Sequence, residues 1–290
     1  MMRLYELNEM SRQAFHDRLN RHYQRQQEEQ HLLQLIRQIR EDHPKMSARM
    51  MYLKLHPQTM GRDRFEVFCF ENGFKVQCKR NYRRTTNSNG VIRFDNLIQG
   101  LELTGVNQVW VSDITYYELG NEFCYLTFFM DLFSRLIVGY SASQDLRTEN
   151  TTIPAFKMAC KVRGANCLID LIIHSDGGGQ YYSREFIKIT KKVKHSMSDS
   201  VYENPHAERI NGIIKNDYLY PYNPKDFPEL VKMLKRAVNN YNNGKPHGAL
   251  KKLSPVEFEK SKIEKSTNQD FINKRKKEAK KEKLTQHYIY

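Results

Sequence analysis

Hydrophobic residues in the first third of the chain recur every three or four positions, which is the spacing of amphipathic helices. The spacing is clearest in residues 31–44, at Leu32, Leu35, Ile36 and Ile39. Ser47 is a suitable N-cap for a second helix, and Gly73 is a suitable end for a third helix that follows a turn at residues 56–61. The pattern therefore predicts a region of short helices, with a helix-turn-helix outline, over residues 1–80.

In a DNA-reading helix-turn-helix, Arg62 and Arg64 would lie at the N-terminal end of the second helix, where side chains reach a groove. A plain helical bundle with solvated arginines explains the same pattern, and this stretch does not separate the two interpretations. Residues 81–105 begin with basic residues and continue with small and polar ones, which is typical of a linker.

From residue 108 the pattern changes to alternation and to continuous apolar runs, which indicate strands. Four runs have this character: VWVSDITYY, FCYLTFFMDLFS, RLIVGYSAS and LIDLIIHSD. A helical segment, TENTTIPAFKMACKV, separates the third run from the fourth, and further helical segments follow. This order predicts an α/β domain over residues 106–260, in which helices flank a mixed sheet. The lysine-rich residues 261–290 are predicted to form a basic tail.

The formal net charge of the 290-residue chain is +14 at pH 7. Residues 1–105 carry 18 Lys and Arg against 12 Asp and Glu, residues 106–250 carry 17 against 15, and residues 251–290 carry 12 against 6. Basic flanks around a near-neutral centre favour a nucleic acid as partner, because a basic surface attracts polyanions. Solvated Lys and Arg faces without a partner are the alternative.

Several classes of protein are disfavoured by the same sequence. No apolar run approaches the length of a membrane span, and the first residues lack the apolar stretch of a signal peptide, so we expect a cytoplasmic protein without a membrane partner. The five cysteines show neither CxxC spacing nor paired histidines, so neither a disulfide framework nor a zinc site is predicted.

Three acidic residues stand at unusual positions. Asp113 shares a face of its strand with Val111, where a carboxylate is costly unless something compensates it. Asp176 follows an apolar run and precedes three glycines, at the carboxyl end of a predicted strand where ligands commonly bind. Glu208 lies in a helix that opens at Asn204 and Pro205. Taken singly, each acid could equally be a hydrogen-bonded or capping residue.

A step of 100° per residue places Glu208, Asn211 and Lys215 on one face of that helix. The opposite face is apolar and carries Ile210, Ile213 and Ile214. Three carboxylates brought together repel one another and need cations to remain ionised. Two Mg²⁺ ions suit such oxygen ligands, because they can activate an attacking oxygen and stabilise a leaving oxygen at phosphorus.

Five segments in this order resemble one family: VWVSDITY, FMDLFSRLIVGY, HSDGGGQYYS, ENPHAERINGIIK and YNNGKPHGALKKLSPVEF. They resemble the integrase-core (rve) DDE transposases of IS-three-type insertion sequences, the second-reading-frame or OrfB-type products, which are related to retroviral integrases. The resemblance covers residues 105–260 and implies a ribonuclease-H-like fold. It also implies a bacterial enzyme that works at the nucleoid, uses Mg²⁺ or Mn²⁺, and cuts and joins DNA at the ends of its own element.

The resemblance carries site residues and partners with it. It implies catalytic and metal-binding roles for Asp113, Asp176 and Glu208, and a basic DNA-contacting role for Lys215. It further implies action on element ends and target DNA as a homo-oligomer, with a first-reading-frame product as a possible partner. Other candidate DNA contacts are Asn211, Arg209, His174, Arg62 and Arg64.

Two departures from the family pattern affect the third acid. The interval between Asp176 and Glu208 holds 31 residues, a few fewer than the family norm, and three glycines replace Arg-Gly-Ser after Asp176. Glu203 and Asp199 are therefore competitors for the role of Glu208. A ribonuclease-H-like nuclease that stops after hydrolysis, and a catalytically silent DNA-binding regulator, are the alternative functions.

Some residues near these motifs have a structural interpretation. His174 could orient Asp176 or contact phosphate, but a satisfied histidine at a strand end explains it as well. Asp131 and Arg135 are interpreted mainly as architecture. Trp110, Tyr116 and Tyr117 lie in the most apolar strand, and we interpret them as core residues rather than as platforms for stacking bases.

Overall fold

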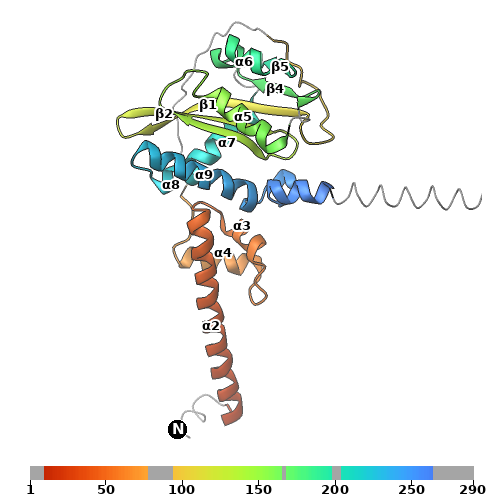
Figure 1. Cartoon of the computed structure of the whole chain (residues 1–290). Coiled ribbons are helices and arrows are strands. Elements are labelled where there is room, and N and C mark those ends of the chain that lie inside the picture. The colour runs from red at the N-terminus through yellow and green to blue at the C-terminus, as the bar shows by residue number, and fades with distance from the viewer. Residues whose placement is uncertain (1–9, 78–93, 165–167, 198–203, 264–290) are drawn as a thin grey trace, which may run out of the picture. The chain divides into compact units, whose positions relative to one another are not determined.

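A computed structural model describes residues 10–77, 94–164, 168–197 and 204–263. The chain divides into two compact units, residues 1–80 and 81–290, which are described separately (Figure 1). Among the described residues, no helix combines the length and the apolar character needed to span a membrane.

The first unit is all-helical, as predicted, and consists of α2 (Arg12–Asp42), α3 (Ala48–Leu55) and α4 (Arg62–Glu71). Ser47 caps α3 by accepting a hydrogen bond of 3.4 Å from the Met50 N–H, so the predicted N-cap is confirmed. The unit has a small core, formed by Leu32, Ile36, Ile39, Met51, Phe65 and Cys69 among others.

The expectation of only short helices was wrong for α2, which runs for 31 residues. Its buried residues are confined to its C-terminal part, where it packs with α3 and α4, and its N-terminal part extends away from them (Figure 1). The N-terminal part carries few apolar residues, Phe15, Leu19 and Tyr23, so the hydrophobic pattern that marks a helix is sparse there.

The second unit contains a five-stranded mixed sheet with strand order β3-β2-β1-β4-β5. Its strands are β1 (Val109–Leu119), β2 (Glu122–Asp131), β3 (Ile137–Ser143), β4 (Ile172–Ser175) and β5 (Lys194–Met197). The first three strands are antiparallel neighbours, whereas β4 is parallel to both β1 and β5. The ribonuclease-H-like mixed sheet that the sequence predicted is thus present, with β5 as an additional short strand.

Helices cover both faces of this sheet. The labelled α-helices are α5 (Thr152–Arg163), α6 (Arg184–Ile189), α7 (Pro205–Ile213), α8 (Tyr220–Tyr222) and α9 (Phe227–Gly244), and residues 255–263 are also helical. The other helical turns are η2 (Gly179–Tyr182), the π-helical η4 (Ile214–Leu219) and η5 (Gly248–Leu250). In Figure 1, α7, α8 and α9 gather on one side of the sheet.

Successive side chains of β1 point to opposite faces of the sheet, and a separate hydrophobic layer lies on each face. Val109 and Val111 face the layer that α7 and α9 complete, whereas Trp110 faces the layer of α5 and α6. Gly139 of β3 allows α5 to approach closely, because a Cβ there would lie 2.1 Å from the Ala155 carbonyl oxygen.

Asp131 ends β2 and organises the turn that follows. It is fully buried and accepts hydrogen bonds from the backbone N–H groups of Asn107 (2.6 Å), Phe133 (3.0 Å) and Ser134 (2.9 Å). These bonds compensate the burial of a charged group, so the interpretation of Asp131 as architecture is confirmed.

Candidate active site

The register of two parallel strands brings the first two predicted acids together. β1 and β4 pair from Val109 with Ile172 to Val111 with His174. Continuing this register by two residues places Asp176, just beyond the end of β4, opposite Asp113 in the middle of β1. The two carboxyl groups are close enough for their mutual hydrogen bond to contribute to a raised pKa of Asp113.

The environment of Asp113 strongly disfavours its charged form. Burial, followed by the charges of Asp176 and Glu208, raises the pKa of Asp113 to about 8, although the Ile114 N–H donates to its Oδ1 at 2.8 Å. Three carboxyl groups therefore influence one another here. A cation bound among them would remove the repulsion that raises this pKa.

The loop after β4 holds Asp176 at this edge of the sheet. The Gly178 N–H donates a hydrogen bond of 3.1 Å to Asp176 Oδ1. Gly177 has a φ of +82°, and a Cβ there would lie 2.0 Å from the Met197 Cε atom. The positive φ favours glycine at position 177, whereas the Met197 side chain could move to admit a Cβ.

Helix α7 crosses β1 and contributes the remaining polar groups. Its Asn211 Nδ2 donates a hydrogen bond of 2.7 Å to Asp113 Oδ2, and the buried Oδ1 of the same amide has no hydrogen-bond partner among the described residues. Glu208 is solvent-exposed on α7 and lies near enough to raise the pKa of Asp113. Asn211 and Glu208 thus approach the Asp113 carboxyl from the helix.

Lys215 reaches β1 two residues beyond Asp113. Its Nζ donates hydrogen bonds to Thr115 Oγ1 at 2.7 Å and to the Tyr116 carbonyl at 3.2 Å. Burial lowers the pKa of Lys215, and the charge of Asp113 opposes that change. Lys215 lies in the π-helical η4, so the step of 100° per residue of a regular α-helix does not give the direction of its side chain. It still extends to the same strand as Asn211 does.

The sequence also matches known proteins in this region. Two family profiles, both described as "Integrase core domain", match residues 104–202 and 191–255. The insertion element IS600 uncharacterized 31 kDa protein of Shigella sonnei is 32% identical over 206 residues, covering 69% of this chain and 75% of that protein. An uncharacterized transposase-like protein of Haemophilus influenzae is 30% identical over 192 residues, covering 64% of this chain and 87% of that protein.

The chain belongs to the integrase-core family of insertion-sequence transposases. It is accordingly a polynucleotidyl transferase of the transposase and integrase type, as predicted, and neither alternative function finds support. Among solved structures, the HTLV-2 integrase catalytic core domain in complex with magnesium is 24% identical, with a TM-score of 0.43. That match covers 53% of this chain and 96% of the viral one.

The remaining predicted DNA contacts of the transposase lie in different surroundings. His174 is fully buried in β4, with Nδ1 2.9 Å from Ser196 Oγ of β5. This position fits a histidine that makes a hydrogen bond within the fold at the end of a strand. A contact of His174 with DNA stays a prediction. Arg209 is exposed on α7, near His206 and His247, whose pKa values it helps to lower.

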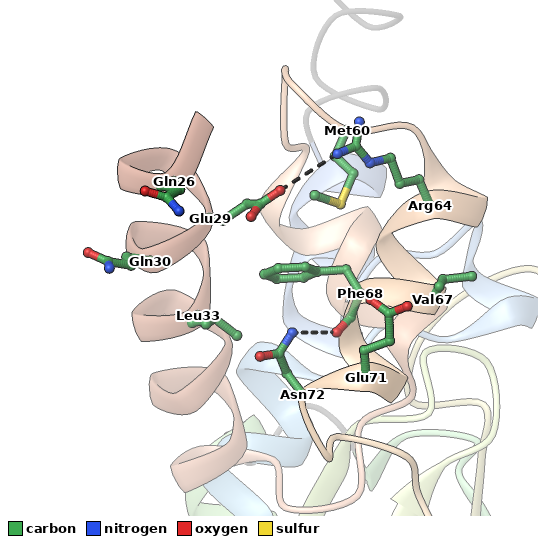
Figure 2. Close-up of a pocket in the computed structure, with 10 residues that line it drawn as sticks. All are labelled: Gln26, Glu29, Gln30, Leu33, Met60, Arg64, Val67, Phe68, Glu71 and Asn72. Atoms are coloured by element: carbon green, nitrogen blue, oxygen red, sulfur yellow. Dashed lines mark hydrogen bonds and ion pairs between the residues drawn. The ribbon is translucent and has the colours of Figure 1, made fainter. Parts of the chain in front are cut away.

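The two predicted arginines of the helical unit lie at the start of α4. Arg62 is exposed and pairs with Asp63 at 2.7 Å. Arg64 lies 3.6 Å from Glu29 of α2, at the rim of a hollow of about 560 Å³ whose inner wall includes Leu33 and Phe68 (Figure 2). Both arginines are thus at the helix end where the prediction placed them, and their contact with DNA stays a prediction.

Several residues around the acids escaped the sequence analysis. Tyr181 Oη lies 2.8 Å from Ser112 Oγ beneath the site, and Asn204 Nδ2 donates to the Ser112 carbonyl at 3.1 Å. Ordinary polar residues such as these give no sequence signal of a role. Glu203 and Asp199, the competitors of Glu208, lie outside the described residues.

One interpretation of the aromatic residues in β1 was wrong. Trp110 and Tyr117 are buried, as expected, but Tyr116 is 38% exposed. Beyond Val111, β4 no longer pairs with β1, so this part of β1 has an open edge next to the acids.

Proposed function

We propose that Asp113, Asp176 and Glu208 bind divalent metal ions, two Mg²⁺ or Mn²⁺, and that this site cuts and joins DNA strands at the ends of an insertion sequence. The observation that supports the proposal is the hydrogen-bonded carboxyl pair of Asp113 and Asp176 on an open strand edge, with Glu208 beside it. Closely spaced carboxylates repel one another, which does not stabilise a fold, but several carboxylates must lie close together to bind the same metal ion.

The residues present fit a hard divalent cation. All three acids offer oxygen, and the unpartnered amide oxygen of Asn211 adds a fourth candidate oxygen donor. Among the described residues, no three His, Cys, Asp or Glu side chains are grouped closely enough to hold one ion. The proposal therefore requires the exposed Glu208 carboxylate to turn towards the pair when metal and DNA bind.

The side chains have distinct tasks in this proposal. The bound ions would supply activation of the attacking oxygen and stabilisation of the leaving oxygen. Asp113 and Asp176 would hold the ions that bind the reacting phosphate, and Asn211 orients the Asp113 carboxylate by donating to Oδ2. Lys215 places a positive charge at the strand edge, where it attracts the DNA backbone.

The flanking regions would hold the rest of the DNA. We assign DNA contacts to Arg209 and His174 in the core and to Arg62 and Arg64 at the start of α4. Residues 81–105 would act as the linker, residues 106–260 as the catalytic core and residues 261–290 as a basic tail. A homo-oligomer would bring together two element ends and the target DNA at the nucleoid, with a first-reading-frame product as a further partner.

The test is strand cleavage by the full chain on a duplex made from the inverted repeat that flanks the gene. Asp113→Asn, Asp176→Asn and Glu208→Gln should each abolish Mg²⁺-dependent cutting, because an amide loses the ligand charge with little change of shape. Asp170→Asn and Glu118→Gln change exposed carboxylates elsewhere and serve as matched controls. Normal cutting by Glu208→Gln would remove Glu208 from the site and make Glu203 the next candidate.

A further inference from the structure

Tyr116 belongs to an aromatic surface at the open edge of β1. Its ring packs against the exposed Phe123 of β2 in an edge-to-face contact, with centroids 5.6 Å apart. In the β1–β2 register, Tyr116 is paired with Tyr125, so the two side chains share one face of the sheet. That face is opposite to the one that carries Asp113, because neighbouring residues of a strand point to opposite faces.

A hollow of about 240 Å³ lies on this face and extends to Asp176. Its walls include Ile114, Tyr116, Tyr125, Leu146, Gln180 and Tyr181. Gln180 Nε2 donates a hydrogen bond of 3.0 Å to the Leu146 carbonyl, which ties two walls together. Aromatic and aliphatic side chains thus form most of the lining of the hollow, which also includes Asp176, a proposed metal ligand.

A cation lies next to one of the aromatic residues that line the hollow. The Lys215 ammonium is 5.2 Å from the centroid of the Tyr116 ring, although Lys215 itself does not line the hollow. A phosphate attracted by Lys215 would leave its base within reach of that ring. Aromatic side chains of this kind stack on any base, because every base has a π face.

We propose that this hollow, the Tyr116 pocket, receives one unstacked base of the DNA strand next to the bond that is cut. The inference rests on the proposed function, since it places the strand at Asp113 and Asp176. Taking one base out of the stack would let the adjacent phosphate leave its regular position in the duplex and approach the acids. Stacking on Tyr116 would offset the cost of extruding that base.

Two variants test the pocket in opposite ways. Leu146→Trp fills the hollow from an exposed position, and Tyr116→Ala removes the stacking ring. Tyr116→Phe keeps the ring, and Val162→Ala truncates an exposed side chain on α5 as a control. Because the side chains changed are partly exposed, all four proteins should fold, and thermal melting checks this.

The first readout needs no cutting. 2-Aminopurine is placed at successive positions near the end of the inverted-repeat duplex, and its fluorescence is followed when the full chain binds. Wild type and Val162→Ala should change the signal at one position only, whereas Leu146→Trp should leave it unchanged. Absence of any position-specific change with wild-type protein bound to the duplex would overturn the proposal, whatever the outcome for the metal site.

The second readout is cutting. Tyr116→Ala should cut the intact duplex roughly tenfold to a hundredfold more slowly than wild type, and Tyr116→Phe should be near normal. An abasic site at the position identified by fluorescence removes the cost of extrusion, so it should restore most of the rate of Tyr116→Ala. Wild-type rates for Tyr116→Ala, or an equal defect at every abasic position, would refute the pocket while leaving the metal site standing.

Discussion

The Asn211 amide donates a hydrogen bond of 2.7 Å to Asp113 Oδ2 and so connects α7 with the middle of β1. Four residues later, Lys215 makes the corresponding connection to Thr115, two residues farther along the strand. The helical segment formed by α7 and η4 thus contacts β1 at two points, with an amide at the carboxyl pair and a cation at the open edge. In the proposed function, α7 orients the first acid and η4 places the cation that attracts the DNA backbone.

Replacing Asn211 with Ala should weaken the site without removing any acid. Partners that orient a metal ligand commonly contribute a factor of 10 to 100 in affinity or activity, and we expect a loss in this range. The measurement is the rate of cutting as a function of Mg²⁺ concentration. Asn216→Ala, an exposed amide in η4, is the control and should behave like wild type. An unchanged Mg²⁺ dependence in Asn211→Ala would show that Asp113 needs no such support.

Lys215→Ala should separate the handling of DNA from the binding of metal. Loss of the ammonium leaves the carboxyl pair in place, so metal binding measured by calorimetry without DNA should stay near the wild-type value. Cutting and joining should fall, and Lys215→Arg should be milder because the charge is retained, although its planar shape alters the contact. If Lys215→Ala cuts and joins normally, the contacts of Lys215 with β1 are merely structural.

His247 should make the stability of the core sensitive to acid. Burial, together with the charges of Lys245, Arg135 and Arg209, lowers the pKa of His247 to about 4, and its ring packs on Tyr241 with centroids 4.9 Å apart. The folded protein therefore disfavours the proton, so the stability contributed by neutral His247 is complete above its unfolded pKa near 6.5. It is lost as the pH falls from there towards 4.

Denaturant unfolding at pH 7.5 and at pH 5 measures this effect. His247→Gln should reduce the loss of stability between the two pH values by roughly 1 to 3 kcal/mol. His22→Gln, on the exposed part of α2, is the control and should keep the wild-type loss. Equal pH dependence in His247→Gln and wild type would mean that the imidazole is protonated without cost in the folded state.

The basic tail provides a prediction about salt. Deleting residues 261–290, most of which lie outside the described part of the chain, should flatten the slope of log affinity against log salt concentration, because fewer phosphates are neutralised. Preference for the inverted repeat over unrelated DNA should remain, since phosphate contacts position a protein without reading sequence. An unchanged slope would show that the tail does not touch DNA.

The sheet and its carboxyl pair were largely predictable, because alternation and apolar runs report which side chains are buried. Asp113 interrupts an apolar face and Asp176 follows an apolar run, and both signals survive in a single sequence. β5 was missed because its four residues, KHSM, are too short and too polar to form a pattern. The length of α2 was missed because apolar residues are sparse in its N-terminal part.

The exposure of Tyr116 shows a different limit of sequence reasoning. Alternation assigns a residue to a face of its strand, but it does not say where the neighbouring strand stops. β4 pairs with β1 only as far as Val111, so the second half of β1 is an edge although its sequence is as apolar as the first. The π-helical turn that redirects Lys215 is likewise a consequence of packing and not of local pattern.

The central claim, that Asp113 and Asp176 hold metal together with Glu208, is tested most directly by counting bound Mn²⁺ with electron paramagnetic resonance. The full chain bound to the inverted-repeat duplex is titrated with Mn²⁺, and wild type is compared with Asp113→Asn and with the Asp170→Asn control. We predict two tightly bound ions in wild type and in the control, and loss of at least one in Asp113→Asn. Identical Mn²⁺ binding by all three proteins would contradict the claim.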